Sequence, residues 1–168
     1  MEALQELAAV MEGVREGAKE ISGEALATVE KVWHEVNEHL NVHFVKEEEV
    51  FFPFIERLIP GARVKFQFLH VDHERLREAF ESYTFALQNY RAAGGSVEGV
   101  QVLRTVAGEM IRWFSYHIVA EDSIYFEIAG SELSADESAD VLRRMALIED
   151  RLREREIEVR KTVGGSQK

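Results

Sequence analysis

Residues 43–53 read HFVKEEEVFFP, a stretch that places a histidine and a run of acidic residues inside an otherwise apolar, aromatic segment. His43 and Glu47 are four residues apart, so in a helix both side chains lie on one face. Burying even one unpaired carboxylate costs several kcal/mol. The stretch therefore predicts a helix whose buried face carries charges that need a cation to offset them.

The rest of the chain divides into long segments with helical periodicity, separated by glycine and proline residues. The clearest breaks are at 60–61, 92–96 and 129–134. We expect helices at about 2–21, 24–59, 63–92, 97–129 and 133–163. Short connections make neighbouring helices antiparallel, which predicts an all-α, up-down-up-down four-helix bundle with one additional helix.

The composition limits the number of domains and the kinds of partner. A chain of 168 residues with 46% hydrophobic content suits one domain, expected at 1–163, followed by a disordered tail at 164–168. The net charge of −11 disfavours nucleic acid and anionic membrane surfaces. The N-terminus lacks a basic targeting segment and no apolar run is long enough to span a membrane, which favours a cytoplasmic protein.

The apolar seam of each helix, formed by positions three and four residues apart, identifies candidate metal ligands. The second predicted helix carries His43 and Glu47 on its seam, and the fourth carries His117 and Glu121 at the same spacing. The third contributes His73. Counted from the connecting turns, these residues lie at one level of the bundle, so imidazoles and carboxylates converge there.

Without cysteine, a metal ion would be held by imidazole and carboxylate alone. This donor set suits iron, zinc or manganese, and iron in particular. Two glutamates on facing helices are placed to bridge metal ions, which predicts non-haem iron at about two ions per chain. A mononuclear site or another divalent metal is the open alternative.

The residues that carry these features resemble a known family. HFVKEEEVFFP at 43–53 resembles the HFxxEExxLFP signature of the hemerythrin-like (HHE cation-binding) proteins. The stretch from His73 through Leu76 and the stretch from His117 through Asp122 are similar to that family's EHexL and HIxxED elements. The resemblance implies a four-helix bundle in which the matching histidines and glutamates hold a non-haem di-iron centre.

The sequence also departs from the family pattern. The family usually has a histidine on its first bundle helix, and residues 2–21 contain none. A further third-helix histidine found in some members is replaced by Leu69, with His70 next to it. His39, one turn before His43, could chelate an ion together with it. His39 and His70 are thus additional candidates, as ligands or as hydrogen-bond donors to a ligating carboxylate. Either the first or the fifth predicted helix could form the fourth wall.

Members of this family bind oxygen, sense oxygen, iron or redox state, or repair nitrosatively damaged iron centres. The resemblance implies a protein that binds or senses oxygen or nitric oxide. A di-iron enzyme or an iron-centre repair or iron-handling factor, of oxidase or peroxidase type, is the alternative, so enzymatic activity is left open. A helical interaction protein with a polar core layer is the non-metal alternative. The ferritin-like arrangement is disfavoured because no histidine has a glutamate three residues before it.

Overall fold

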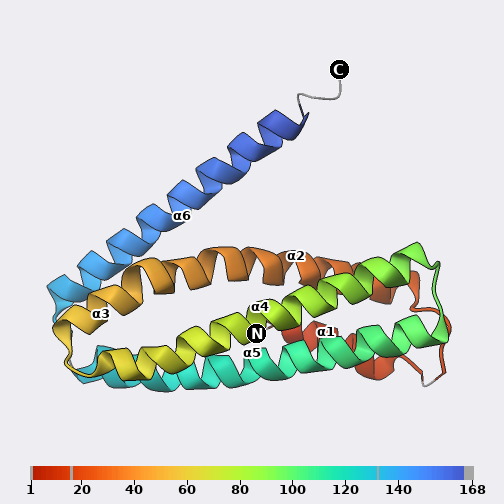
Figure 1. Cartoon of the computed structure of the whole chain (residues 1–168), viewed down its shortest axis with the longest axis horizontal. Coiled ribbons are helices and arrows are strands. Elements are labelled where there is room, and N and C mark those ends of the chain that lie inside the picture. Colours follow the sequence, from red (N-terminus) through yellow and green to blue (C-terminus); the bar gives the residue numbers. More distant parts are fainter. Residues whose placement is uncertain (1, 16, 132, 165–168) are drawn as a thin grey trace. The chain divides into compact units, whose positions relative to one another are not determined.

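The computed structural model describes residues 2–15, 17–131 and 133–164, and within these ranges every regular element is helical. The elements are α1 (Glu2–Gly13), α2 (Gly23–Lys46), the π-helical turn η1 (Glu47–Phe51), α3 (Phe52–Leu58), α4 (Ala62–Ala92), α5 (Val97–Ser131) and α6 (Ala135–Gly164) (Figure 1). The prediction of an all-α helical bundle with an additional helix is confirmed.

The helices are organised in two units. The first unit comprises Met1–His39 and Phe68–Ser123, and the second comprises Leu40–Gln67 and Ile124–Lys168. The long helices α2, α4 and α5 each contribute to both units, whereas α1 belongs to the first and α3 and α6 belong to the second. That residues 1–163 form a single domain stays a prediction.

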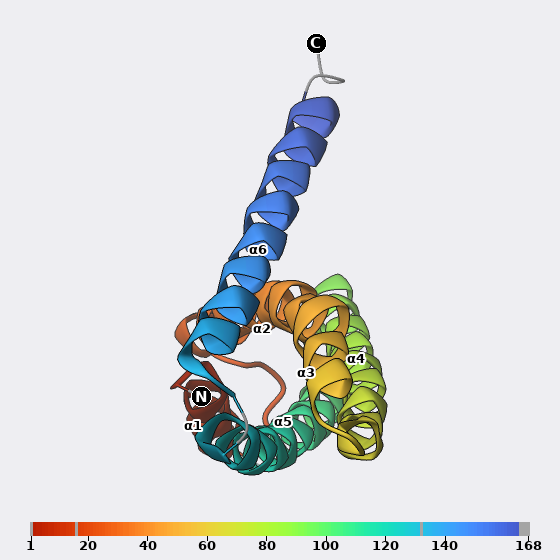
Figure 2. The same cartoon turned by 90° about the vertical axis from the view of Figure 1, so that its left-hand side faces the viewer.

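The first unit contains α1 together with parts of α2, α4 and α5 (Figure 2). Each of these helices contributes buried apolar residues to the core. The buried residues of α1 are Leu4, Leu7 and Met11. Lys31 of α2 forms an ion pair with Glu6 of α1 at 2.9 Å. In this unit the helix that accompanies α2, α4 and α5 is therefore α1.

Aromatic side chains connect α2 to α4 in the same unit. The ring of Trp33 stacks on Phe80 with centroids 5.9 Å apart, and its Nε1 donates a hydrogen bond to Thr84 Oγ1 at 2.7 Å. The hydroxyl of the buried Tyr83 donates to the carbonyl oxygen of Val29 at 3.1 Å. These directional contacts fix the two helices against each other.

The first helix is shorter than the sequence predicts. A helix over 2–21 was expected, but α1 ends at Gly13, and Gly17 adopts a positive φ of 76°. Glycine lowers helix propensity and adopts this left-handed conformation readily, so the two glycines end the helix. Ile21 is nevertheless buried, and its backbone N–H donates to the hydroxyl of Tyr90 at 2.8 Å.

The helix predicted at 24–59 contains a π-helical turn. The backbone is right-handed helical on both sides of η1, and the N–H of Phe52 donates to the carbonyl of Glu47, five residues back. Pro53 has no N–H, and in a regular helix its ring would clash with the carbonyl of Glu49. The wider turn immediately before Pro53 relieves this clash. It also places the next buried residue at Phe52, which is five positions after Glu47 and 1% exposed.

The last helix begins with a capping box. The backbone N–H of Ser134 donates to Glu137 Oε2 at 2.9 Å, and the N–H of Glu137 donates to Ser134 Oγ at 3.3 Å. The helix therefore starts at Ala135, slightly later than predicted. Of the predicted tail at 164–168, Gly164 belongs to α6 and the other residues lie outside the described part of the chain.

Candidate metal centre

Three of the predicted ligands meet in the interior of the first unit. His73 on α4 is 0% exposed and His117 on α5 is 2% exposed. Their ring centroids lie 4.8 Å apart, with an angle of 70° between the planes. Glu121, one turn further along α5, places its Oε2 3.5 Å from His117 Nε2 and is 9% exposed. Helical spacing and the packing of α4 against α5 thus gather two imidazoles and one carboxylate.

The other two predicted ligands form a pair in the second unit. Nε2 of His43 lies 3.3 Å from Oε1 of Glu47. The Glu47 side chain is fully buried, whereas the His43 side chain is 27% exposed. Glu47 is also the first residue of η1. Single π-helical turns within α-helices are frequent at functional sites, and this one starts at a buried carboxylate.

The donor atoms fit a metal ion better than they fit an apolar core. Glu47 and Glu121 are buried carboxylates, and each has a histidine nitrogen within hydrogen-bonding or ion-pair range. A cation bound beside them would offset the cost of removing their charge from water. Imidazole nitrogen with carboxylate oxygen suits iron, zinc or manganese. These histidine and glutamate groups are compatible with a metal site.

The two additional candidates are placed differently. His39 is exposed on α2, one turn before His43. His70 is exposed on α4, and its ring centroid lies 6.4 Å from that of His73. A histidine at such a position could reach only a solvent-facing side of an ion. The roles of both residues remain predictions.

Charged residues next to Glu47 pair with α6, an arrangement that sequence reasoning missed. Lys46 donates through Nζ to Glu149 at 3.2 Å, and Arg151 donates through a guanidinium nitrogen to Glu49 at 2.6 Å. The hydrogen bond and charge of Lys46 lower the pKa of Glu149 below its usual value. The run of three glutamates suggests a solvated face, and no local pattern specifies a partner about a hundred residues away.

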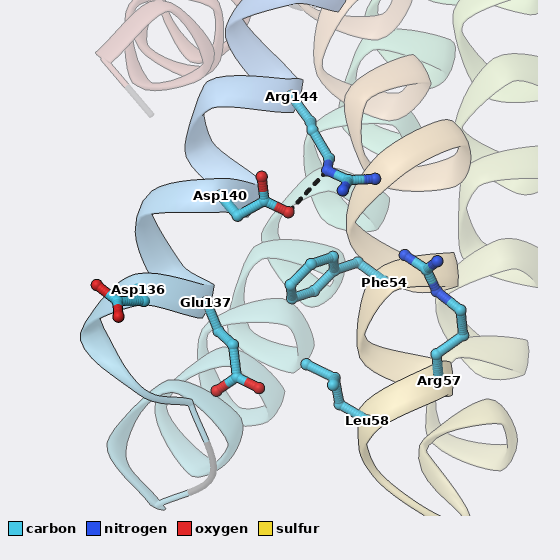
Figure 3. Close-up of a pocket in the computed structure, with 7 residues that line it drawn as sticks. All are labelled: Phe54, Arg57, Leu58, Asp136, Glu137, Asp140 and Arg144. Carbon is cyan, nitrogen blue, oxygen red and sulfur yellow. Dashed lines mark hydrogen bonds and ion pairs between the residues drawn. The ribbon is translucent and has the colours of Figure 1, made fainter.

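A cavity of about 440 Å³ lies between α3 and the start of α6 (Figure 3). It is lined by Phe54, Arg57, Leu58, Asp136, Glu137, Asp140 and Arg144. Arg144 donates to Asp140 at 2.8 Å, and its guanidinium carbon is 5.8 Å from the centroid of the Phe54 ring. None of the predicted metal ligands lines this cavity, so it is a feature of the contact between α3 and α6.

A helical bundle with histidine and glutamate pairs one turn apart on its buried faces defines a cation-binding class of all-α protein. Residues 1–129 match the family model of the hemerythrin HHE cation binding domain. The chain belongs to this family, as the motifs at 43–53, 73–76 and 117–122 predict. No curated protein and no solved structure was found to match the chain.

The extent of the family match and the length and apolar character of the helices give two further findings. The match ends at residue 129, so α6 lies outside it. Among the described residues, no helix has the length and apolar character needed to span a membrane.

Proposed function

We propose that this protein binds non-haem iron in its bundle core and uses it to bind or sense oxygen or nitric oxide. The observation that carries the proposal is the burial of Glu47 and Glu121, each one helical turn from a histidine on the same face. Buried carboxylates in two separate helices are costly unless a cation accompanies them. Membership of a cation-binding family supports the same conclusion.

The proposed ligands are His43, Glu47, His73, His117 and Glu121. Within each unit, the ligand pairs are already at short range. Support for this ligand set comes from the equal heights of these residues along the helices predicted from the sequence and from the match to the family model. The two carboxylates, together with the three imidazoles, would hold about two iron ions.

Iron held by these groups would supply reversible binding of a small diatomic molecule. Helix α1 would supply no imidazole or carboxylate to that iron, because its buried residues are the apolar Leu4, Leu7 and Met11. None of these side chains has the imidazole nitrogen with which a first-helix histidine binds metal in the family. We propose that an exogenous ligand takes this position, with His39 or His70 completing the coordination at the solvent edge.

The experiment that tests this proposal is metal titration with an absorption spectrum. Protein stripped of metal is titrated with ferrous iron and, separately, with zinc by calorimetry under anaerobic conditions. We expect about two ferrous ions per chain, and visible charge-transfer bands when oxygen is added to the loaded protein or when azide is added after the iron has been oxidised. A chain that binds neither metal contradicts the proposal. Iron that binds without any spectral response to azide, oxygen or nitric oxide contradicts the ligand-binding part alone.

A further inference from the structure

The π-helical turn that carries Glu47 is contacted from α6 by two ion pairs, one on each side of the buried carboxylate. Lys46 precedes Glu47 and pairs with Glu149 at 3.2 Å. Glu49 follows it and pairs with Arg151 at 2.6 Å. All four residues belong to the second unit. The segment 46–49, which joins the last residue of α2 to the first three residues of η1, is therefore held to α6 at both of its ends.

We propose that Glu149 and Arg151 are positioning residues that hold η1 in its π-helical form and so orient Glu47 for metal. This inference rests on the proposed function, since it assumes that Glu47 is a ligand. Coupling between two sites is reciprocal. Docking of α6 strengthens metal binding, and bound metal strengthens the docking of α6.

A π-helical turn needs such support because it is rare and less favourable than the α-helix. The hydrogen bond from Phe52 to Glu47 spans five residues. If this turn returned to α-helical geometry, the residues after it would rotate by about 100° relative to those before it. Phe52 is 1% exposed and stacks on Phe66 with centroids 4.6 Å apart. Rotation would break this packing and change the surroundings of the Glu47 carboxylate.

The packing of α6 against η1 depends strongly on the ion pairs of Glu149 and Arg151, because few apolar side chains of α6 are buried. Val141 is buried, but Leu142 and Leu147 on the same helix are 65% and 62% exposed. The cavity between α3 and α6 leaves the start of α6 loosely packed (Figure 3). With little apolar burial in this contact, the ion pairs contribute a large share of what holds α6 against η1.

The test compares two arginine substitutions in the full chain. Arg151→Gln removes the pair to Glu49, whereas Arg143→Gln removes a pair to Asp140 that lies within α6 and does not involve Glu149. Both variants change the charge equally and keep similar helix propensity. We expect Arg151→Gln to weaken ferrous iron binding about threefold, the size of one partly exposed ion pair. Arg143→Gln should bind iron like the wild type.

Hydrogen exchange supplies a readout that does not need metal. In metal-free protein, amides at 44–56 should exchange faster in Arg151→Gln and at the wild-type rate in Arg143→Gln. Added iron should slow exchange at 140–155 in the wild type, because the coupling is reciprocal. A charge swap gives a rescue test: Glu49→Arg and Arg151→Glu should each weaken iron binding, and the double variant should restore most of the loss.

Two results overturn the inference while the wild type still binds iron. The first is equal exchange at 44–56 in Arg151→Gln and Arg143→Gln. The second is a double charge swap that binds iron no better than either single variant, which would show a general effect on α6. Failure of the proposed function is a different result, in which the wild type binds neither iron nor zinc. In that case the proposed coupling between α6 and metal binding is also excluded, whatever the hydrogen exchange rates are.

Discussion

The imidazole rings of His73 and His117 lie edge to face with their centroids 4.8 Å apart, although they come from different helices. Both side chains are almost completely buried. Two imidazoles in this arrangement bring nitrogen atoms from α4 and α5 into one small volume, as a shared metal ion requires. The distance between these two candidate ligands is therefore set by the packing of α4 against α5.

Replacing His73 with glutamine should weaken ferrous iron binding by at least about tenfold, since losing even a hydrogen-bonding partner of a metal ligand costs about that much. Calorimetry on metal-free protein measures the change. The matched control is His34→Gln, which removes an exposed histidine from α2. Equal affinities in the two variants would exclude His73 as a ligand.

Replacing both Glu47 and Glu121 with glutamine should have opposite effects with and without metal. Metal at 100 times its Kd stabilises the native state by about 2.7 kcal/mol, which raises the melting temperature by roughly 5–10 °C in a chain of this size. The double variant should lose this rise. Without metal it should melt at or above the wild-type temperature, because two buried charges are gone.

Thermal unfolding with and without ferrous iron or zinc measures both effects. The control replaces the exposed Glu38 and Glu109, on α2 and α5, with glutamine and should keep the full metal-induced rise. A double variant at Glu47 and Glu121 that still shows that rise would remove these carboxylates from the centre.

His39→Ala should reduce the iron stoichiometry from about two to about one if His39 closes the solvent edge of one ion. His43, one turn along α2 and itself 27% exposed, could chelate that ion with it. Metal analysis and the visible spectrum of the oxidised protein measure the change. His34→Ala is again the control. An unaltered stoichiometry and spectrum would leave that position to His70 or to a solvent molecule.

The buried Tyr83 should make the protein less stable at alkaline pH. Burial raises the pKa of its hydroxyl above the ordinary value of about 10. Above that pH the unfolded chain loses a proton that the native state retains, so the free energy of unfolding falls as pH rises. The slope from this residue approaches about 1.4 kcal/mol per pH unit. It should be absent in Tyr83→Phe and kept in Tyr116→Phe, whose side chain is exposed.

Urea unfolding at a series of pH values between about 9 and 11.5 tests this prediction. Tyr83→Phe should also cost about 1 kcal/mol at neutral pH, because the hydrogen bond to the Val29 carbonyl is lost. Parallel pH dependence in the wild type and Tyr83→Phe would contradict the assignment.

The helices of this fold could be predicted from apolar periodicity and from glycine and proline breaks. The expected helix at 63–92 corresponds to α4 at Ala62–Ala92, and the one at 97–129 corresponds to α5 at Val97–Ser131. Apolar periodicity wrongly predicted that the first helix continues to Ile21. That residue is buried without being helical. A buried side chain gives the same sequence signal whether a helix or an irregular segment carries it.

The candidate centre was predictable where ligands share a helix and less so elsewhere. Helical spacing alone pairs His43 with Glu47 and His117 with Glu121. The π-helical turn has no propensity signal, although Pro53 and the five-residue interval between the buried Glu47 and Phe52 are consistent with it. The ion pairs from α6 depend on tertiary packing among many similar surface charges, so no sequence pattern distinguishes them.

The stacking of Trp33 on Phe80 has a consequence for spectroscopy. The chain has two tryptophans, and the other, Trp113, lies under the guanidinium of Arg75 at 5.1 Å, also in the first unit. Indole emission is therefore a local reporter of the first unit, whereas far-ultraviolet circular dichroism reports all helices. If residues 1–163 form one domain, denaturation curves from the two signals should coincide. A dichroism transition that begins before the emission changes would reveal that the second unit melts on its own.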